Sequence, residues 1–441
     1  MNLVALELDE RTPRGIAAAL ARLITSGDLA PGDRLPTVRD LAAELGVSPA
    51  TVSHAWQTLA AAGLITSRGR SGSFVRSAPR EWLPTRYRGL EGREAARLDL
   101  SRGTPDPELL PELGPALARV SDRASPVSYQ SKPDIPELHD LLRATWPAPV
   151  ESLTVTNGAL DAIDRALGAL VRLGDRIVLE DPTFPPFLDL VELYGLEAIP
   201  VAVDAEGMRP DEFARALGRG PALVLLQPRA HNPTGASMSG ERAERLASLV
   251  RRSRMAERTV VIEDDHSSMI SRSPDVSLAR WLPERVLHVR SFSKSHGPDL
   301  RIGALGGPRT LIDRVVARRL LGPGWTSRMV QALLFELLTD PESTAQLDIA
   351  RESYAARQAA LSAGLARHGV ETSAADGINI WLEVDNERQA MVRLAAAGIQ
   401  VAPGSPFQAG EPLPRLRVTA GVVPVETAQD VAAVLATAAR S

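Results

Sequence analysis

The segment Val289-Arg-Ser-Phe-Ser-Lys-Ser-His-Gly-Pro-Asp-Leu-Arg301 contains one of only two lysines in a chain of 441 residues that has 50 Lys and Arg side chains. Serines flank this residue, Lys294, and an apolar run precedes it. An arginine guanidinium stays protonated, whereas a lysine amine can lose its proton and form a Schiff base with an aldehyde. The segment therefore indicates a covalent cofactor site. The alternative is that a lysine merely survived a bias toward arginine, and the rest of the chain distinguishes the two.

Length and composition limit the class of protein. A chain of 441 residues predicts two or three domains, and a hydrophobic fraction of 44% is ample for a large core. A net charge of -4 argues against a protein that coats nucleic acid, but it is compatible with a small DNA-reading module. Without cysteine there are no disulfides, thiolate metal sites or thiol catalysis, and we expect no metal. With neither a signal peptide nor an apolar run of the ~20 residues that span a bilayer, we expect a cytoplasmic protein without membrane contact.

Residues 12–76 have the hydrophobic spacing of a helix-turn-helix module. A first helix is predicted to end at Gly27, because its apolar residues share one face, namely Ile16, Leu20, Leu23 and Ile24. A second helix is predicted at residues 38–45. Ser48 is expected to cap a third helix that begins at Pro49, since a hydroxyl there accepts from free N–H groups and proline suits the first turn.

Two short segments beyond this module, residues 64–66 and 73–75, are predicted to pair as a hairpin whose arginine-bearing tip suits contact with phosphates. On the segments GDLAPGDRLPTVRDLAAELGVSPATVSHAWQTLAAAGLI and GRSGSFV, this part of the chain resembles the GntR-type winged helix. The resemblance implies that five residues approach DNA phosphates or the groove: Arg39, Ser48, Thr51, Arg68 and Arg70.

The predicted recognition helix departs from many members of that family, which have arginine near the positions of Pro49 and Ser53. Base readout would then fall to DNA shape or to one of four residues: Ala50, Ser53, His54 or Gln57. Residues 1–76 hold eight arginines against seven acidic residues, so the module is barely basic. The alternative use of such a module is contact with another protein.

Residues 77–98 are predicted to form a linker, because prolines and glycines interrupt any regular pattern there. The alternative is that arginines of this segment reach DNA beside the wing, namely Arg80, Arg86 and Arg88.

From residue 128 to residue 307, helical segments alternate with short β-branched runs, which is typical of an α/β sheet covered on both faces. The predicted strands are residues 153–156, 176–180, 198–201, 223–227, 259–263, 286–289 and 302–305. Ligands of such sheets gather where strands end and loops begin.

Polar motifs stand at these strand ends. Thr156-Asn-Gly-Ala159 opens a helix, and free N–H groups at a helix start bind anions. Phe184 lies in a proline-rich loop, where its ring either stacks on a planar cofactor or joins the core. Asn232 presents an amide beside a proline, and Val261-Ile-Glu-Asp-Asp-His266 leads an apolar strand into carboxylates that need partners. With Lys294 these motifs supply what pyridoxal phosphate requires: an amine, a carboxylate for the ring nitrogen, a donor for the ring hydroxyl and a phosphate cup.

On these motifs, residues 98–441 resemble fold type I aminotransferases. The resemblance implies that Lys294 is the Schiff-base lysine, Asp264 the partner of the pyridinium nitrogen and Asn232 the donor to the ring oxygen. It implies Phe184 as the stacking ring. The phosphate would be held by Gly158, Ala159, Ser291, Ser293 and Arg301.

Two further positions follow from the same resemblance. Tyr129, in SYQSKPDIPEL, matches a tyrosine that reaches the phosphate of a neighbouring subunit, which implies a dimer. Arg417, in LPRLRVTAG, fits the arginine that clamps the substrate carboxylate, with Arg415 as the alternative. His266 takes the cofactor-binding position where the family usually has tyrosine, so any transaminase turnover is expected to be weak or vestigial.

A GntR-type winged helix followed by such a domain is the architecture of MocR-type transcriptional regulators, which the chain resembles over nearly its whole length. The predicted domains are residues 1–76 (winged helix), 77–98 (linker), 99–340 (large α/β domain with an N-terminal segment) and 341–441 (small α+β domain). The resemblance implies a homodimer that binds two half-sites of double-stranded DNA, pyridoxal phosphate and a small amine or amino acid. The alternatives are a working aminotransferase with an accessory winged helix, and a pure interaction protein.

Overall fold

The computed structural model describes residues 11–61, 64–67, 72–76, 84, 86, 96–121, 132–372 and 376–440. It divides into two compact units: residues 1–84 with 189–196, and the rest of the chain. We call them the N-terminal unit and the C-terminal unit.

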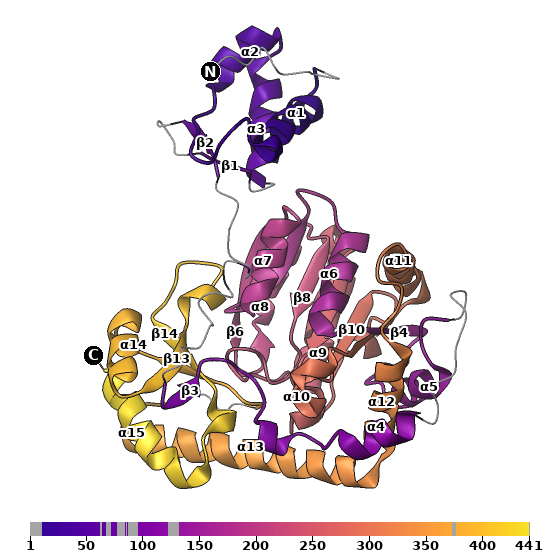
Figure 1. Ribbon diagram of the computed structural model, residues 1–441, viewed down its shortest axis with the longest axis vertical. Coiled ribbons are helices and arrows are strands. Elements are labelled where there is room, and N and C mark those ends of the chain that lie inside the picture. Colours follow the sequence, from indigo (N-terminus) through magenta and orange to yellow (C-terminus); the bar gives the residue numbers. More distant parts are fainter. Residues whose placement is uncertain are drawn as a thin grey trace. The chain divides into compact units, whose positions relative to one another are not determined.

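The N-terminal unit has the three predicted helices and the hairpin (Figure 1). Its elements are α1 (Pro13–Ser26), α2 (Val38–Leu45), α3 (Pro49–Ala61), β1 (Ile65–Ser67) and β2 (Ser73–Val75). The Thr12 hydroxyl caps α1, and Gly27 ends it in a left-handed conformation with φ 86°. Ile16 and Leu20 are fully buried, and Leu23 and Ile24 pack partly buried against the same apolar cluster, which confirms the helical face predicted from their spacing.

The C-terminal unit contains an eight-stranded sheet in the order β4-β11-β10-β9-β8-β5-β6-β7. Its strands are β4 (Ser152–Thr156), β5 (Arg176–Asp181), β6 (Glu197–Asp204), β7 (Gly207–Met208), β8 (Leu223–Leu226), β9 (Val260–Asp265), β10 (Val286–Ser291) and β11 (Gly303–Gly307). Strands β6, β5, β8, β9 and β10 run parallel, whereas β11 is antiparallel to both of its neighbours. Every strand predicted for this region is present.

Helices cover both faces of this sheet (Figure 1). One apolar cluster joins it to α8 (Pro210–Leu217) and α9 (Gly240–Arg252) through Phe213 and Leu246. Another joins it to α5 (Pro136–Ala144) and α12 (Arg328–Thr339) through Leu142 and Leu334. The helices after the linker are η4 (Pro107–Leu109), α4 (Gly114–Ser121), α5 (Pro136–Ala144), α6 (Ala159–Leu170), α7 (Pro185–Leu193), α8 (Pro210–Leu217), α9 (Gly240–Arg252), η5 (Arg254–Ala256), η6 (Ser268–Ile270), η7 (Leu278–Arg280), α10 (Ser293–His296), η8 (Pro298–Leu300), α11 (Arg309–Leu320), α12 (Arg328–Thr339), α13 (Pro341–Arg367), α14 (Glu387–Ala396), η9 (Ser405–Phe407), η10 (Ala420–Val422), η11 (Val425–Thr427) and α15 (Ala428–Ala439).

A smaller sheet has the order β12-β14-β13-β3, with strands β3 (Leu98–Leu100), β12 (Ile380–Glu383), β13 (Ile399–Pro403) and β14 (Arg415–Val418). The predicted boundary would give residues 99 and 100 to the large domain, but β3 pairs in parallel with β13. The physical reason is burial, because Leu100 belongs to the same apolar cluster as Leu382 and Leu416. The long helix α13 runs along the C-terminal unit from α15 toward α4 (Figure 1).

Among the described residues, no helix is both long enough and apolar enough to cross a membrane.

Candidate cofactor site

Lys294 lies on α10, directly after β10, and its side chain is half-buried. Its Nζ donates a hydrogen bond of 2.8 Å to the carbonyl oxygen of Gly103. Burial and the nearby charge of Arg417 lower the pKa of Lys294 to about 8, and the charge of Asp264 acts in the opposite direction. A lysine with this pKa is partly neutral near neutral pH, as a nucleophilic amine must be.

Asp264 lies near the end of β9 and is buried beside Lys294. Burial raises the pKa of Asp264 to about 7, although a 2.8 Å hydrogen bond from Gln227 Nε2 to its Oδ2 acts against this. The other carboxyl oxygen, Oδ1, is buried and has no hydrogen-bond partner within the described part of the chain. A buried carboxyl with one open oxygen is suited to a ring nitrogen that shares a proton with it.

Gln227 connects Asp264 to the loop that carries Asn232. Its Oε1 accepts a 2.8 Å hydrogen bond from the Asn232 backbone N–H. The Asn232 amide oxygen is itself buried and unpaired in the described structure. Gln227 was not among the residues predicted for the site, although its place at the end of a predicted strand was a usable signal. Gln227, Asn232 and Asp264 therefore form one connected group with two open polar atoms.

The residues predicted to hold the phosphate lie where three strands run side by side. The register pairs Ser291 of β10 with Gly303 of β11, and Gly303 with Thr156 of β4. Gly158 has φ 94° and precedes α6, whose start has no side-chain cap. A Cβ atom at Gly158 would lie 3.2 Å from Nη2 of Arg301, so the guanidinium reaches the start of the helix.

This arrangement suits an anion, because free N–H groups, the helix dipole and a guanidinium converge there. The structure thus brings Gly158, Ala159, Ser291 and Arg301 together. Ser293 lies close by, since its N–H donates to Ser291 Oγ at 3.3 Å.

Arg417 lies on β14 of the small sheet and is 1% exposed. Its guanidinium donates to the carbonyl oxygen of Ser101 and lies 5.1 Å from the ring centre of Phe407. Burial lowers the pKa of Arg417 to about 10, which the charge of Asp99 partly offsets. Its Nε is buried and makes no hydrogen bond to any described residue. An inward-facing guanidinium with an open N–H suits a carboxylate.

Arg415, the alternative clamp, has other contacts. It forms a 3.2 Å ion pair with the exposed Glu383 and donates to the carbonyl of Pro414. Arg417 and Lys294 instead flank the same short loop at Gly103. The structure therefore favours Arg417 over Arg415 for this role.

Gly103 has φ 62°, and a Cβ there would lie 2.8 Å from Arg417 Nη1. We therefore expect Gly103→Ala to displace this guanidinium and to lower the free energy of unfolding by about 1–3 kcal/mol. Urea denaturation measures this. Gly114→Ala is the control, because a Cβ added there would meet no atom within 4 Å, and it should change stability by less than about 0.5 kcal/mol. Equal stability of the two variants would contradict the close approach of the Arg417 guanidinium to Gly103.

Phe184 and His266 were also predicted to bind the cofactor, and both make contacts with other protein residues. Phe184 is half-buried, and its ring meets Phe187 edge-on at 5.4 Å. His266 Nε2 donates to the carbonyl of Ala230 at 2.8 Å. Burial, followed by the charge of Lys294, lowers the pKa of His266 to about 3, so the ring is neutral. One ring nitrogen of His266 is thus committed to the loop that carries Asn232.

The predicted DNA-binding residues are only partly described. Arg39 is exposed on α2. Ser48 Oγ accepts from the Thr51 N–H at 3.2 Å, which confirms the predicted cap of α3. Three candidate base-reading residues, Ala50, His54 and Gln57, are exposed, whereas Ser53 is half-buried. Arg68, Arg70 and Tyr129 lie outside the described residues, so their roles stay predictions.

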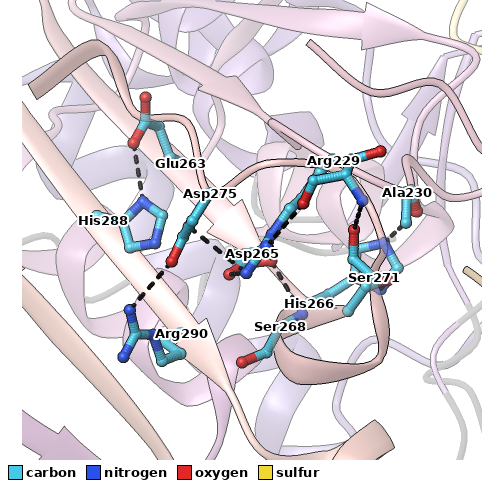
Figure 2. A network of polar contacts seen from close by, with 12 residues as sticks. Arg229, Ala230, Glu263, Asp265, His266, Ser268, Ser271, Asp275, His288 and Arg290 are labelled. Atoms are coloured by element: carbon cyan, nitrogen blue, oxygen red, sulfur yellow. Dashed lines mark hydrogen bonds and ion pairs between the residues drawn. The ribbon is translucent and has the colours of Figure 1, made fainter. Parts of the chain in front are cut away.

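The neighbours of Asp264 in sequence face away from the cofactor residues, because successive residues of a strand point to opposite faces. The register sets His288 beside Glu263 and Arg290 beside Asp265. Figure 2 shows the resulting polar network. Arg229 binds Asp265 through two hydrogen bonds of 2.7 and 3.0 Å. Sequence patterns did not predict this network, because only pairing of the strands brings its members together.

Within this network, ligand atoms of Asp265, Asp275 and His288 lie within 4.8 Å of one another. That spacing alone would admit a metal ion. However, Arg229 forms ion pairs with both Asp265 and Asp275, and Arg290 forms another with Asp275. The carboxylates therefore already have cationic partners, and the trio is part of a salt-bridge network.

Comparison with known proteins agrees with this geometry. Residues 97–435 match the family description "Aminotransferase class I and II", and residues 12–75 match "Bacterial regulatory proteins, gntR family". A winged helix joined to an aminotransferase-like body defines the MocR-type transcriptional regulators, and the chain belongs to this family.

Particular relatives share nearly the whole architecture. The chain is 38% identical over 417 residues to the vitamin B6 salvage pathway transcriptional repressor PtsJ of Salmonella typhimurium, covering 93% of this chain and 95% of PtsJ. It is 30% identical over 433 residues to the HTH-type transcriptional regulator TauR of Rhodobacter capsulatus, covering 87% of each.

Solved structures confirm the fold of the C-terminal unit. The multiple substrate aminotransferase of Thermococcus profundus aligns with a TM-score of 0.73 and 21% identity, covering 82% of this chain and 95% of that enzyme. LysN, the α-aminoadipate aminotransferase of Thermus thermophilus, aligns with a TM-score of 0.69 and 22% identity, covering 82% and 98%.

Proposed function

We propose that this regulator binds DNA through its winged helix and pyridoxal phosphate at Lys294, and that its DNA binding responds to the cofactor or to an amine that reacts with it. The observation that carries the proposal is the pair formed by half-buried Lys294 and buried Asp264, near the ends of neighbouring strands. Each member has a pKa shifted toward neutrality, and Asp264 keeps one open oxygen. Such perturbed pairs are typical of functional sites.

The residues present fit this cofactor. The start of α6 and Arg301 would hold the phosphate, Asn232 the ring oxygen, and Asp264 the ring nitrogen. When bound, the cofactor supplies an aldehyde that forms a Schiff base with an amine. Two comparisons support this: PtsJ is named as a repressor of vitamin B6 salvage, and LysN was solved with N-(5'-phosphopyridoxyl)-L-leucine.

An amino acid is the ligand class that suits the rest of the site. Its carboxylate would bind Arg417, which leaves its amine close to Lys294. Ligand at this position would contact both the small and the large sheet, so it would favour their closed arrangement. In the homodimer that we propose, such closure would change the spacing of two winged helices on two half-sites.

The proposal is tested by footprinting the region upstream of the gene with the full-length chain, with and without pyridoxal phosphate. We expect the cofactor to change the protected segment or the protein concentration that half-protects it. Lys294→Ala should protect the DNA without responding to the cofactor. An identical cofactor response in parent and variant would refute a sensing role for Lys294.

Arg39 is expected to contact a DNA phosphate. Arg39→Ala should then weaken binding to specific and unrelated DNA by a similar factor and reduce the slope of log K against log salt by about 1. Fluorescence anisotropy at several salt concentrations measures both. Arg22→Ala, on α1, is the matched control and should leave the slope unchanged. An effect on one DNA sequence alone would instead assign Arg39 to base readout.

A working aminotransferase is the second candidate, because Asn232, Asp264 and Arg417 are present and buried and Lys294 is present and half-buried. The commitment of His266 to the Ala230 carbonyl argues for weak turnover, since it replaces a usual hydrogen-bond donor to the cofactor. An assay with a panel of amino acids and 2-oxoglutarate separates the two. Robust multiple turnover without any specific DNA site would favour the enzyme.

A further inference from the structure

A second cavity, of about 290 Å³, borders the polar network of Figure 2. Arg229, Arg290 and Arg351 line it together with Ser268 and Asp275. It adjoins the strand face toward which Asp265 and Arg290 point, whereas Asp264 points to the other face. The cavity is therefore separate from the cofactor residues, although β10 contributes Arg290 to the cavity and Ser291 to the cofactor residues.

Three arginines line this cavity, and each has a carboxylate partner. Arg229 is neutralised by Asp265, with which it makes two hydrogen bonds. Arg290 donates to the hydroxyl and carbonyl of Thr145 and lies 3.4 Å from Asp275. Arg351 pairs with Asp348, whose side chain is 69% exposed, so solvent screens this pair. Arg351 is therefore the lining arginine whose carboxylate partner is the most exposed to solvent.

Ser268 provides an independent observation. It is 1% exposed and lines the cavity, and its hydroxyl has no hydrogen-bond partner in the described chain. Its backbone has φ 44°, a conformation that costs energy for a residue other than glycine. A 2.9 Å hydrogen bond from the backbone N–H of Ser268 to Asp265 Oδ1 holds it there. A strained residue with an unsatisfied buried hydroxyl is typical of a ligand site.

Most of the remaining lining residues are apolar, Leu142 and Phe292 among them, and the polar ones are Thr145 and Ser271. We propose that this cavity is a second ligand site, which binds a small organic carboxylate. The carboxylate would lie between Arg290, Arg351 and the Ser268 hydroxyl, and a short apolar chain would contact Leu142 and Phe292. The proposal does not depend on cofactor binding.

The loop that carries Ser268 is also tied to the small domain. Asp376 accepts hydrogen bonds from the N–H groups of Arg272 and Ser273, at 3.1 and 2.9 Å, and from the hydroxyl of Ser271. Its own N–H donates to the carbonyl of Gly235, in the loop that carries Asn232. Ligand in the second cavity would therefore contact a loop that is connected to both the small domain and the cofactor residues.

The test uses 4-methylpentanoate, a branched carboxylate that has neither an amine nor an aldehyde or ketone group and so cannot react at Lys294. It is titrated by calorimetry into the full-length chain loaded with pyridoxal phosphate. Arg417→Met removes the carboxylate clamp of the first site, and we expect this variant to keep one bound equivalent. Adding Arg351→Met should weaken that binding at least tenfold, and adding Ser268→Ala about fivefold.

Arg367→Met, on the same helix as Arg351, is the matched control and should leave the affinity unchanged. If Arg417→Met fails to fold, the same variants are compared in the parent chain, where Arg351→Met should remove one of two equivalents. Absence of binding in a folded Arg417→Met chain would overturn the proposal. Equal affinity of the Arg351 and Arg367 variants would overturn it as well.

Discussion

Replacing Lys294 with alanine is expected to abolish covalent attachment of pyridoxal phosphate. The chain has only two lysines, so the site of attachment can be identified without ambiguity. Borohydride reduction of the loaded chain should add one phosphopyridoxyl group to the peptide that contains Lys294, as measured by mass spectrometry. The reason is that burial and Arg417 lower the pKa of this amine to about 8, which makes a neutral nucleophile available.

The variant should retain weak binding, because the start of α6 and Arg301 would still hold the phosphate. We expect its affinity for the cofactor to fall at least 100-fold, or about 2.7 kcal/mol. Lys132→Ala is the control, since Lys132 is exposed and should stay unlabelled. Labelling of Lys132 in the parent chain, or an unchanged mass increase in Lys294→Ala, would refute the assignment.

Asp264→Asn is expected to stabilise the cofactor-free chain at pH 8 and to leave it nearly unchanged at pH 4. Burial raises the pKa of Asp264 from 3.8 to about 7, so the folded chain retains a proton that the unfolded chain has lost. The stability contributed by this proton is fully present below about pH 4 and is lost as pH rises through 7. A pKa difference of about three units corresponds to about 4 kcal/mol. This is an upper limit for the difference in the free energy of unfolding between variant and parent at pH 8.

The measurement is urea denaturation of parent and variant at pH 4, 6 and 8 without cofactor. Asp265→Asn provides the opposite control on the next residue. Arg229 outweighs burial there and lowers the pKa of Asp265 to about 2, so its carboxylate stabilises the fold at every pH tested. Asp265→Asn leaves Arg229 without its main partner and should lower the free energy of unfolding by about 3–5 kcal/mol. Destabilisation by Asp264→Asn at pH 8 would contradict the buried, neutral state of Asp264.

Asp264→Asn should also weaken cofactor binding, because it removes the acceptor for a protonated ring nitrogen. A charged hydrogen bond contributes about 1.5–3 kcal/mol, so we expect a loss of about 10- to 100-fold. Asp264 thus destabilises the empty chain at pH 8 and stabilises the loaded one. A site with this property makes the stability of the fold depend on the cofactor, as a sensor requires.

Much of this architecture is determined by the sequence alone. The strands of the large sheet are predicted because continuous apolar runs such as residues 177–179 suit strands buried on both faces. Gly27 and Ser48 mark helix ends because their effects on the backbone are local. Lys294 stands out because lysine is rare in this chain. Local geometry and residue chemistry act within a few residues, so they can be recognised without knowing the fold.

Only the tertiary structure decides which distant residues meet. Gly103 and Lys294 are 191 positions apart, and no spacing rule predicts their hydrogen bond. The sheet register sets Asp265 beside Arg290, and alternation along β9 gives Asp264 and Asp265 opposite surroundings. The pairing of β3 with β13 and the inward orientation of Arg417 also depend on contacts across the fold. A sequence pattern specifies which face of a strand is buried, but the partner on that face is fixed only when the chain closes on itself.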